Sequence, residues 1–371
     1  MISDSARFNA YAKAISRSVH AGTVVAEIGC GPAVFGVLAC QAGAKRVYAI
    51  ETEDIIGVAK QIAAANGVTD RIQFFQSDSR KGELPERVDV IVSDIRGVLP
   101  LFEGALASLQ DAKKRFLAPN GVMIPQRDVL KCAIIEAEKA YSRLSSPWKT
   151  CAPHVELSVP LQLVLNAGHS ITVKVEQLMS APEELCTLDY MGNPGPNVSA
   201  NLAFQANRNG TAHGICVWFE TTLYEDIGFS TGPESPVGIY GQWFLPWLEP
   251  VVIEEGQAIL VNLHANLVGK DYLWRWETEI PDAAGGKSAH FRQSNFEGAY
   301  VSLHTLRRHA IDHIPVLTAE GEAERFLLEA MDGRASLQEI AERAAKRFAE
   351  VYSSHEDAFE RASELARKFS R

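Results

Sequence analysis

A buried strand that runs into two closely spaced glycines restricts most strongly what this chain can fold into. Residues 23–28 are mostly apolar, Gly29 and Gly31 follow, and Pro32 suits the first position of a helix, where no amide donor is needed. Glycines at such a turn let a ligand approach the backbone, and the amides at the start of the helix point toward it. The pattern predicts a strand–turn–helix unit that binds a nucleotide-like cofactor.

The spacing of the turn favours S-adenosylmethionine over NAD. A nicotinamide-binding fingerprint needs a third glycine at the position where this chain has Val34. The next apolar strand ends at Glu51, about twenty residues after the glycines, where a carboxylate can reach a ribose diol. The residues predicted to bind the cofactor are therefore Glu27, Gly29, Gly31 and Glu51. Taken alone, Glu51 also fits a solvated charge at the end of a strand.

The composition indicates a soluble globular protein with two or three domains. Of the 371 residues, 46% are hydrophobic and 22% are charged, and no apolar run is long enough to cross a membrane. The N-terminal residues are polar, unlike a signal peptide, and the six cysteines form no CxxC pair, which predicts a reducing cytoplasm without metal sites or disulfides. A net charge of −10 argues against binding to nucleic acid or anionic membranes.

Three regions with different patterns follow one another. In residues 1–125, apolar strands alternate with helices, which predicts an α/β domain with a parallel, Rossmann-like sheet. Residues 126–303 contain short β-rich runs separated by glycine and proline turns, which predicts an all-β sandwich or barrel. Residues 304–371 form a predicted helical domain with a capping box at Ser336 and Glu339.

Two carboxylates bracket the loop that follows the predicted strand at residues 88–93. Asp94 comes directly after this strand, and Glu103 lies nine residues later. At the carboxyl end of a strand, such a pair can converge on one planar cation. A purely structural loop, in a methyltransferase that acts elsewhere, is the alternative interpretation.

With this loop, residues 1–300 resemble the protein arginine methyltransferase family, whose loop has the pattern Ser-Glu-Trp-Met-Gly-Tyr and a second glutamate further on. The matching residues are Ser93, Gly97, Leu101 and Glu103 in the loop, and Asp4, Arg7, Tyr11, Ala14 and Ile15 in the opening helix. Two replacements stand out, because Asp94 takes the place of the first glutamate and Arg96 that of the methionine. The family's Thr-His-Trp loop corresponds to Gly241, Gln242 and Trp243, of which only the tryptophan is kept.

The resemblance implies further cofactor contacts and a way to assemble. Arg7 would hold the carboxylate of S-adenosylmethionine, which suits the fork of a guanidinium group. Asp78 and Ser79 would contact the adenine. Family members usually form dimers through an arm, which would lie near residues 137–159, so a homodimer is expected.

The resemblance also implies a chemistry for the acidic loop. Guanidinium is protonated far above neutral pH and is a poor nucleophile, so Asp94 and Glu103 would hold it as a catalytic clamp and draw its positive charge away from the reacting nitrogen. Gln242 and Trp243 would bind the substrate. Arg96 would either neutralise Asp94, bind a carboxylate of the substrate, or point to solvent.

The predicted function is S-adenosylmethionine-dependent N-methylation of a guanidino group, in a protein or peptide arginine or in free arginine. Two alternatives stay open: a small-molecule natural-product N- or O-methyltransferase with Asp94 or Glu103 as general base, and a non-catalytic protein that holds a peptide on a methyltransferase scaffold. The C-terminal helices, around residues 326–340, resemble PqqD-like modules, which capture leader peptides. A helical bundle that only packs on the barrel is the alternative there.

Overall fold

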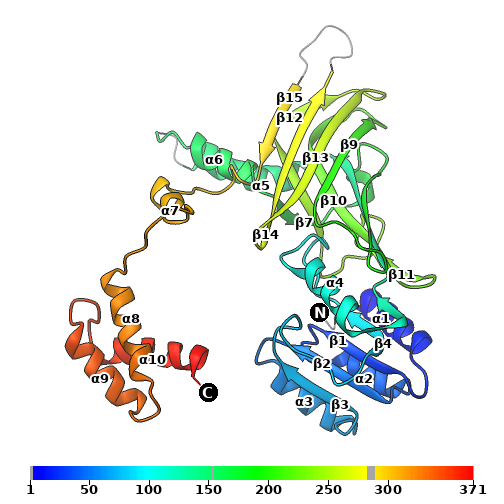
Figure 1. Cartoon of the computed structure of the whole chain (residues 1–371). Helices are drawn as coiled ribbons and strands as arrows, with labels where there is room; N and C mark the ends of the chain where they lie inside the picture. The colour runs from blue at the N-terminus through cyan, green and yellow to red at the C-terminus, as the bar shows by residue number, and fades with distance from the viewer. Residues whose placement is uncertain (1–2, 152–153, 282–288, 371) are drawn as a thin grey trace. The chain divides into compact units, whose positions relative to one another are not determined.

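The chain divides into two units, Met1–Tyr300 and Val301–Arg371 (Figure 1). The computed structural model describes residues 3–151, 154–281 and 289–370. The first unit contains a parallel sheet with its helices, followed by two antiparallel sheets. The second unit is helical in its described part.

The parallel sheet confirms the Rossmann-like architecture predicted for the first region. Its five strands run in the order β3-β2-β1-β4-β5, and all neighbouring strands are parallel. The strands are β1 (Val24–Ile28), β2 (Arg46–Glu51), β3 (Ile72–Gln76), β4 (Val88–Ser93) and β5 (Leu117–Ile124). The helices of this region are α1 (Ser5–Ser18), α2 (Val34–Gln41), α3 (Ile56–Ala65) and α4 (Ala105–Phe116). The pattern of apolar runs does not predict β5 as a strand of its own.

Alternation along β1 divides its side chains between the two faces of the parallel sheet. Val25 packs in one apolar cluster with residues of α1, α2 and α3. Val24, Ala26 and Ile28 pack in another cluster, which includes residues of α4. β1 is buried along its whole length, so both faces of the sheet are covered at this strand. The glycine turn follows the carboxyl end of β1 and therefore lies at the edge of the sheet that stays open.

The second region consists of two antiparallel sheets. The larger sheet has six strands, with the path β7-β12-β10-β6-β8 and β11 paired to β10, and the smaller has the order β15-β14-β13-β9. The strands of the larger sheet are β6 (Arg127–Ile135), β7 (His169–Ile171), β8 (Glu183–Asp189), β10 (Gly210–Tyr224), β11 (Ile227–Ser230) and β12 (Gln242–Ile253). Those of the smaller are β9 (Val198–Gln205), β13 (Ala258–Val268), β14 (Asp271–Ile280) and β15 (Ala289–Ser294).

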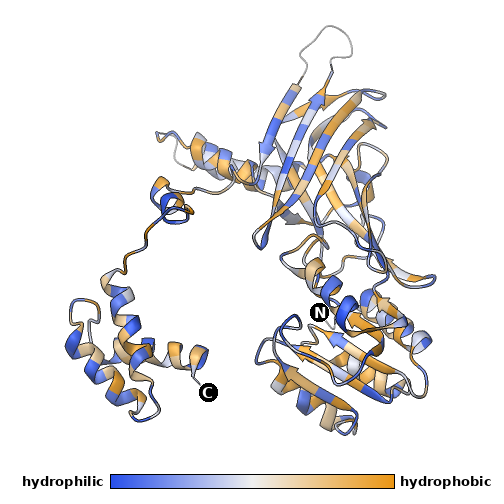
Figure 2. Cartoon of the chain, in the orientation of Figure 1, coloured by the Kyte–Doolittle hydropathy of each residue, from blue (hydrophilic) through white to orange (hydrophobic). Residues whose placement is uncertain are grey.

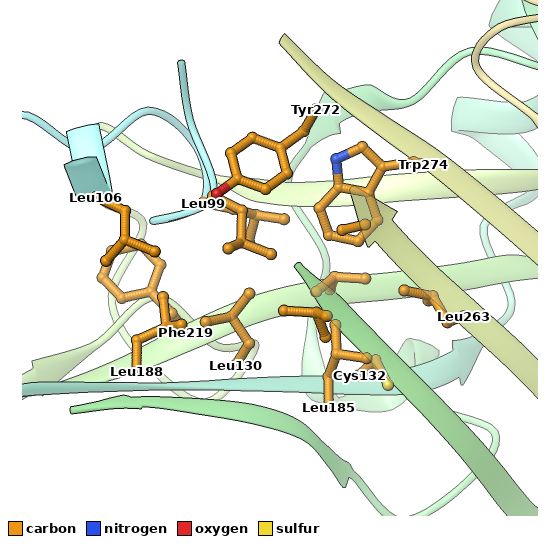
Figure 3. Close-up of a cluster of buried hydrophobic side chains, with 14 of the residues drawn as sticks. Leu99, Leu106, Leu130, Cys132, Leu185, Leu188, Phe219, Leu263, Tyr272 and Trp274 are labelled. Atoms are coloured by element: carbon orange, nitrogen blue, oxygen red, sulfur yellow. The ribbon is translucent and has the colours of Figure 1, made fainter. Parts of the chain in front are cut away.

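The two antiparallel sheets share one apolar core. Along β14, buried side chains such as Tyr272, Trp274 and Trp276 alternate with more exposed ones, and Figure 2 shows apolar and polar residues alternating along these strands. Tyr272 and Trp274 lie in the same cluster as Leu130 and Phe219 of the larger sheet (Figure 3). Two facing antiparallel sheets agree with the β-rich region that the sequence predicts.

Helices interrupt the strands after β6. They are α5 (Glu138–Thr150) and α6 (Ser158–Leu165), which contact each other, and a short 3-10 helix, Val175–Gln177, follows β7. The two α-helices occupy most of the stretch 137–159, where the family resemblance places a dimerisation arm; residues 152 and 153 of it lie outside the described residues. The hydroxyl of Tyr141 donates to the carbonyl of Leu248 at 2.9 Å and so ties α5 to β12.

The second unit has an apolar core of its own. Its helices are α7 (Leu303–Arg308), α8 (Ala319–Ala330), α9 (Leu337–Arg347) and α10 (His355–Phe369). Leu327, Ile340 and Leu365 bring the last three helices together. The predicted capping box is confirmed, because the Glu339 carboxylate accepts from the Ser336 amide at 2.8 Å and the Ser336 hydroxyl accepts from the Glu339 amide at 3.3 Å.

Gly214 tests the packing of the larger antiparallel sheet. It has φ of +151°, and a Cβ at this position would lie 2.3 Å from the Leu245 carbonyl oxygen of β12. We expect Gly214→Ala to lower the free energy of unfolding by about 3 kcal/mol in urea titrations, since backbone must move. Gly256→Ala is the control: φ is +84°, but no atom lies within 4 Å, so the loss should be about 1 kcal/mol. Equal losses would contradict the role of the contact.

Candidate functional site

The carboxyl ends of β1, β2 and β4 border a cavity of about 480 Å³, here called cavity A. Its lining includes the glycine turn, the loops after β2 and β3, and both ends of the acidic loop; the predicted site residues among them are Gly29, Glu51, Asp78, Ser79, Asp94, Arg96 and Glu103. The fold thus brings seven of the predicted residues from four separate segments to one cavity, as expected for a site at the carboxyl edge of a parallel sheet.

Glu51 fastens the glycine turn. Its carboxylate accepts from the Gly31 amide at 2.8 Å and from the Thr52 amide at 2.7 Å. Gly29 has φ of +67°, and a Cβ there would lie 2.2 Å from Cγ2 of Ile95 in the acidic loop. The turn therefore needs glycine because the backbone is left-handed and the acidic loop lies directly against it.

Glu27 lies behind the turn rather than on cavity A. It is buried, and its carboxylate accepts from the Gly36 amide of α2 at 2.8 Å. Burial raises the pKa of Glu27 to about 8, and the nearby negative charge of Glu51 adds to the rise. The side chain links the strand before the turn to the helix after it, and it carries a proton at neutral pH.

Asp78 and Ser79 line cavity A from the loop after β3. Asp78 binds Arg80 through both carboxylate oxygens, with one pair at 2.8 Å, and this hydrogen bonding lowers the pKa of Asp78 to about 2. The backbone carbonyl of Ser79 accepts from Arg115 of α4. The loop is therefore held in place by two arginines.

Asp94 is surrounded by donors. Its carboxylate forms ion pairs with Arg7 of α1 and with Arg96, and it accepts from the hydroxyl of Tyr240. The side chain is only 5% exposed. Two guanidinium groups therefore neutralise this carboxylate, and Arg7, which the resemblance assigns to a cofactor carboxylate, pairs with Asp94 here.

Arg96 does not point to solvent, since its side chain is 2% exposed. Its Nη1 donates to Asp128 at 2.8 Å and to Thr221 at 3.0 Å; its Nη2 donates to Tyr11 at 2.7 Å and to Asp94 at 3.1 Å, and Nε also faces Asp94. A guanidinium has five N–H donors, and all five are used within the protein. Arg96 thus has no donor left for a substrate carboxylate, although it borders cavity A.

The electrostatics of this cluster favour the charged form of Arg96. Burial alone would lower the pKa of Arg96, but Asp128, Tyr11 and Asp94 outweigh it and hold that pKa well above its ordinary value. Asp128 is itself fully buried and accepts from the Tyr190 hydroxyl at 2.6 Å. The cluster joins the parallel-sheet region to β6 through the ion pair with Asp128 and to β10 through the hydrogen bond to Thr221.

Glu103 differs from Asp94 in its exposure and in its contacts. It is exposed, has φ of +41°, and no hydrogen bond or ion pair reaches its side chain from the described residues. It borders cavity A and also a second cavity of about 410 Å³, here called cavity B. Cavity B is lined by Val98, Leu99, Leu101, Phe102, Glu103, Trp243, Asp271, Tyr272, Trp274 and Asn295.

The two substrate residues predicted in the β-rich region are placed differently. Trp243 lines cavity B. Gln242 is buried, with its carbonyl oxygen accepting from the Val173 amide at 2.8 Å and its amide nitrogen donating to the Thr231 carbonyl at 2.6 Å. Both ends of the Gln242 side chain are therefore used by backbone groups.

Four residues of the site have no role predicted from the sequence. Asp128 and Tyr240 complete the charge cluster, and Asp271 and Trp274 complete cavity B. Tyr240 had a usable signal, since it directly precedes the stretch that matches the family's Thr-His-Trp loop. Trp274 had one as well, since the tryptophans at 274 and 276 form a cluster that could stack on a substrate, although barrel core or rim is the alternative interpretation. Asp128 and Asp271 have none, because each meets the site only through strand pairing.

Neither a membrane-spanning helix nor a metal centre is found in the described ranges. None of the described helices is long and apolar enough to cross a membrane. No group of three or more histidine, cysteine or acidic side chains in those ranges is arranged to hold a metal ion.

Comparisons with known proteins identify the family. The model of the ribosomal protein L11 methyltransferase family (PrmA) matches residues 11–126, and that of the arginine methyltransferase oligomerization subdomain matches residues 128–275. A probable protein arginine N-methyltransferase 6 of Arabidopsis thaliana is 31% identical over 305 residues, which cover 70% of this chain and 70% of the relative. The chain belongs to the protein arginine N-methyltransferase family.

Relatives of this arginine methyltransferase family member are named for two substrates, protein arginine and arginine. Protein arginine N-methyltransferase 1 of Schizosaccharomyces pombe is 29% identical over 270 residues, covering 70% of this chain and 78% of the relative. An arginine N(omega)-methyltransferase of Streptomyces achromogenes is 26% identical over 272 residues, covering 71% of this chain and 74% of the relative.

Solved structures share the fold of this family member. The Trypanosoma brucei PRMT1 enzyme–prozyme heterotetrameric complex with AdoHcy has a TM-score of 0.74 at 22% identity and covers 79% of this chain and 96% of its own. Arabidopsis thaliana protein arginine methyltransferase 10 has a TM-score of 0.70 at 21% identity, covering 79% and 95%.

The Arg96 cluster predicts a large cost when its cation is removed. Arg96→Met would leave Asp128 and Asp94 buried with fewer partners, so we expect the free energy of unfolding to fall by about 3–5 kcal/mol in urea titrations. Arg17→Met is the control, because Arg17 pairs with Glu225 and Asp226 at the surface, and its loss should cost under about 1 kcal/mol. Similar costs for both variants would show that the cluster does not hold the regions together.

Glu27 predicts a pH dependence of stability. The folded protein keeps the proton of Glu27 up to about pH 8, whereas the ordinary pKa of a glutamate is 4.5. The contribution of Glu27 to the free energy of unfolding is therefore full below pH 4.5 and is lost as pH rises through about 8. Glu27→Gln keeps an acceptor for Gly36 and carries no charge. We expect the Tm of the unmodified protein to fall more than that of Glu27→Gln between about pH 6 and pH 9. If the Tm of the two proteins changed in parallel with pH, the raised pKa of Glu27 would be refuted.

Proposed function

We propose that the protein transfers a methyl group from S-adenosylmethionine to a nitrogen of a guanidino group. Membership of the arginine methyltransferase family supports the reaction class. The observation that carries the proposal is the position of Glu103, an exposed carboxylate at the border of cavities A and B. A cofactor in cavity A and a guanidino group from cavity B would meet beside this side chain.

Cavity A fits the cofactor by its size and by the chemistry of its lining. Its volume of about 480 Å³ lies in the range of ligand pockets. The Glu51 carboxylate provides acceptors for ribose hydroxyls, and the left-handed turn at Gly29 and Gly31 allows a close backbone approach. Residues 77–79 offer polar groups for the adenine. When bound, S-adenosylmethionine supplies an electrophilic methyl group.

Arg7 and Asp94 are proposed as a coupled pair in this site. Arg7 would bind the cofactor carboxylate beside Asp94, its present partner. Asp94 would then be the second carboxylate near the guanidino group. Because Arg7 and Arg96 already neutralise Asp94, Glu103 supplies most of the negative charge that a substrate cation meets.

Glu103 would act on the guanidino group in two ways. Its carboxylate accepts hydrogen bonds from the guanidinium and fixes the plane of the group, so that the reacting nitrogen is aligned before transfer. It also attracts the positive charge toward the nitrogens that it holds, which leaves more electron density on the remaining nitrogen. After transfer, a Glu103 oxygen takes the proton that this nitrogen releases.

Finer parts of the organisation belong to the proposal as well. The functional parts would be residues 1–125 for the cofactor, 126–303 as a β-barrel for substrate and assembly, and 304–371 as an added helical module of the PqqD-like type. Support comes from the match of residues 128–275 to an oligomerization subdomain and from the separate core of the last unit. A homodimer in the cytoplasm is the proposed form: the match to an oligomerization subdomain supports the assembly, and six free cysteines support a reducing compartment.

A second candidate is an N- or O-methyltransferase of a small molecule without a guanidino group. The observation that favours it is that Glu103 is one exposed carboxylate, while its predicted partner is neutralised; one carboxylate suffices for a general base. A panel of peptide arginine, free arginine and non-guanidine acceptors, assayed for methyl transfer, separates the two candidates. Transfer to non-guanidine acceptors alone would favour the second.

Removing the charge of Glu103 tests the proposed function directly. We expect Glu103→Gln to lower kcat for the preferred guanidino substrate by about 10²-fold or more, because an oriented charge beside the reacting group is lost. The thermal stabilisation by S-adenosylmethionine should stay, since Gly29 and Glu51 are unchanged. Glu83→Gln, at an exposed carboxylate outside both cavities, is the control and should keep full activity. Full activity of Glu103→Gln would refute the mechanism, and no stabilisation of the unmodified protein by S-adenosylmethionine would refute the cofactor.

A further inference from the structure

Cavity B carries negative charge at two places and positive charge at none. Its carboxylates are Glu103, at the border with cavity A, and Asp271, at the start of β14. Among the described residues that line it there is no lysine, arginine or histidine. Its other walls are mostly apolar, with aromatic faces such as Phe102 and Trp274. A bound molecule would therefore meet apolar surface between two anionic groups.

Of the neutral polar side chains in the lining of cavity B, Asn295 is engaged by backbone groups, while Nε1 of Trp243 and the Tyr272 hydroxyl are buried and have no hydrogen-bond partner among the described residues. The Asn295 side chain accepts from the Trp274 amide at 2.9 Å and donates to the Tyr272 carbonyl at 3.0 Å. The indole ring of Trp243 packs directly against Gly168, where a Cβ would lie 2.4 Å from Nε1, so this nitrogen is covered by the chain. A carboxylate entering cavity B would lose water and gain no charged partner there.

Three cations near these segments of the chain do not line cavity B. Arg96, which borders cavity A, donates to Asp128 and other protein groups with all its N–H donors, and Arg80 is bound by Asp78. Lys270 precedes Asp271 in the turn before β14, but it is not among the residues that line cavity B. None of the described residues that line cavity B therefore offers a cation to a carboxylate of the substrate.

We propose that cavity B is a specificity subsite that admits guanidino compounds with an uncharged or cationic body and rejects those with a carboxylate on that body. The proposal rests on the proposed function, in which Glu103 holds the guanidinium and the rest of the substrate extends into cavity B. Asp271 is the residue that sets the charge selection, because it adds the second negative charge. An amide-capped arginine or a guanidinoalkyl amine fits this subsite, and the free amino acid does not.

A matched pair of compounds tests the selection on the unmodified protein. N-acetylarginine amide and N-acetylarginine differ only in whether the end of the molecule is an uncharged amide or a carboxylate. We expect the amide to bind more tightly, measured by tryptophan fluorescence without cofactor, and to have a kcat/KM about tenfold higher in low salt, as two carboxylates then repel the acid. The difference should shrink as ionic strength rises, since Asp271 is exposed and its field is screened.

Two variants of β14 test the residue assignment. Asp271→Asn should reduce the preference for the amide to about two- to threefold, mainly by improving binding and kcat/KM of N-acetylarginine. Glu279→Gln removes the same charge from an exposed position on the same strand outside cavity B, and it should leave the preference unchanged. Both changes are at exposed positions, so folding is expected to survive.

The outcomes separate the subsite from the reaction. If no guanidino compound accepts a methyl group, the proposed function is wrong, and the binding measurement still decides on the subsite. If N-acetylarginine binds and reacts as well as its amide, the subsite is refuted while the proposed function stands. An unchanged preference in Asp271→Asn, or an equal change in Glu279→Gln, overturns the assignment to Asp271.

Discussion

The pairing of Arg96 with Asp128 is the interaction on which the rest of the site depends. Arg96 belongs to the loop after β4, and Asp128 belongs to β6 of the larger antiparallel sheet. Both side chains are almost completely buried, and each would be costly to bury alone. Together they hold the acidic loop against the β-rich region. The ion pair thereby fixes the position of this loop beside cavity A and cavity B.

This pairing also explains why the two acidic residues of the loop have different characters. Arg96 also donates to Asp94, Thr221 and Tyr11. Arg7 and Tyr240 contact Asp94 as well. Asp94 is thereby a buried, neutralised group, while Glu103 stays exposed at the junction of the cavities. A sequence motif with two acids suggests equal partners, but the structure gives them different surroundings: Asp94 pairs with two arginines, and Glu103 borders both cavities.

Local signals in the sequence predict the parallel sheet well. Apolar strands, the glycine turn and Glu51 lie within about thirty residues of one another, and such local patterns follow directly from strand and helix periodicity. The position of Arg96 is not predictable in this way, because its partners Asp128 and Thr221 are separated from it by 32 and 125 residues. Strand pairing between β6 and β10 creates that environment, with Asp128 opposite Thr221.

The two departures from the family's loop are explained together rather than one at a time. Arg96, in place of methionine, puts a cation beside the first acid, and an acid next to two arginines cannot supply free negative charge to a substrate. The shorter Asp94 keeps its carboxylate close to the backbone, within 3.1 Å of Arg96 Nη2, where a longer side chain would place its oxygens about 1.5 Å further out. The substitution of aspartate therefore suits the presence of Arg96, and under the proposed function the pair leaves recognition of the substrate to Glu103 and cavity B.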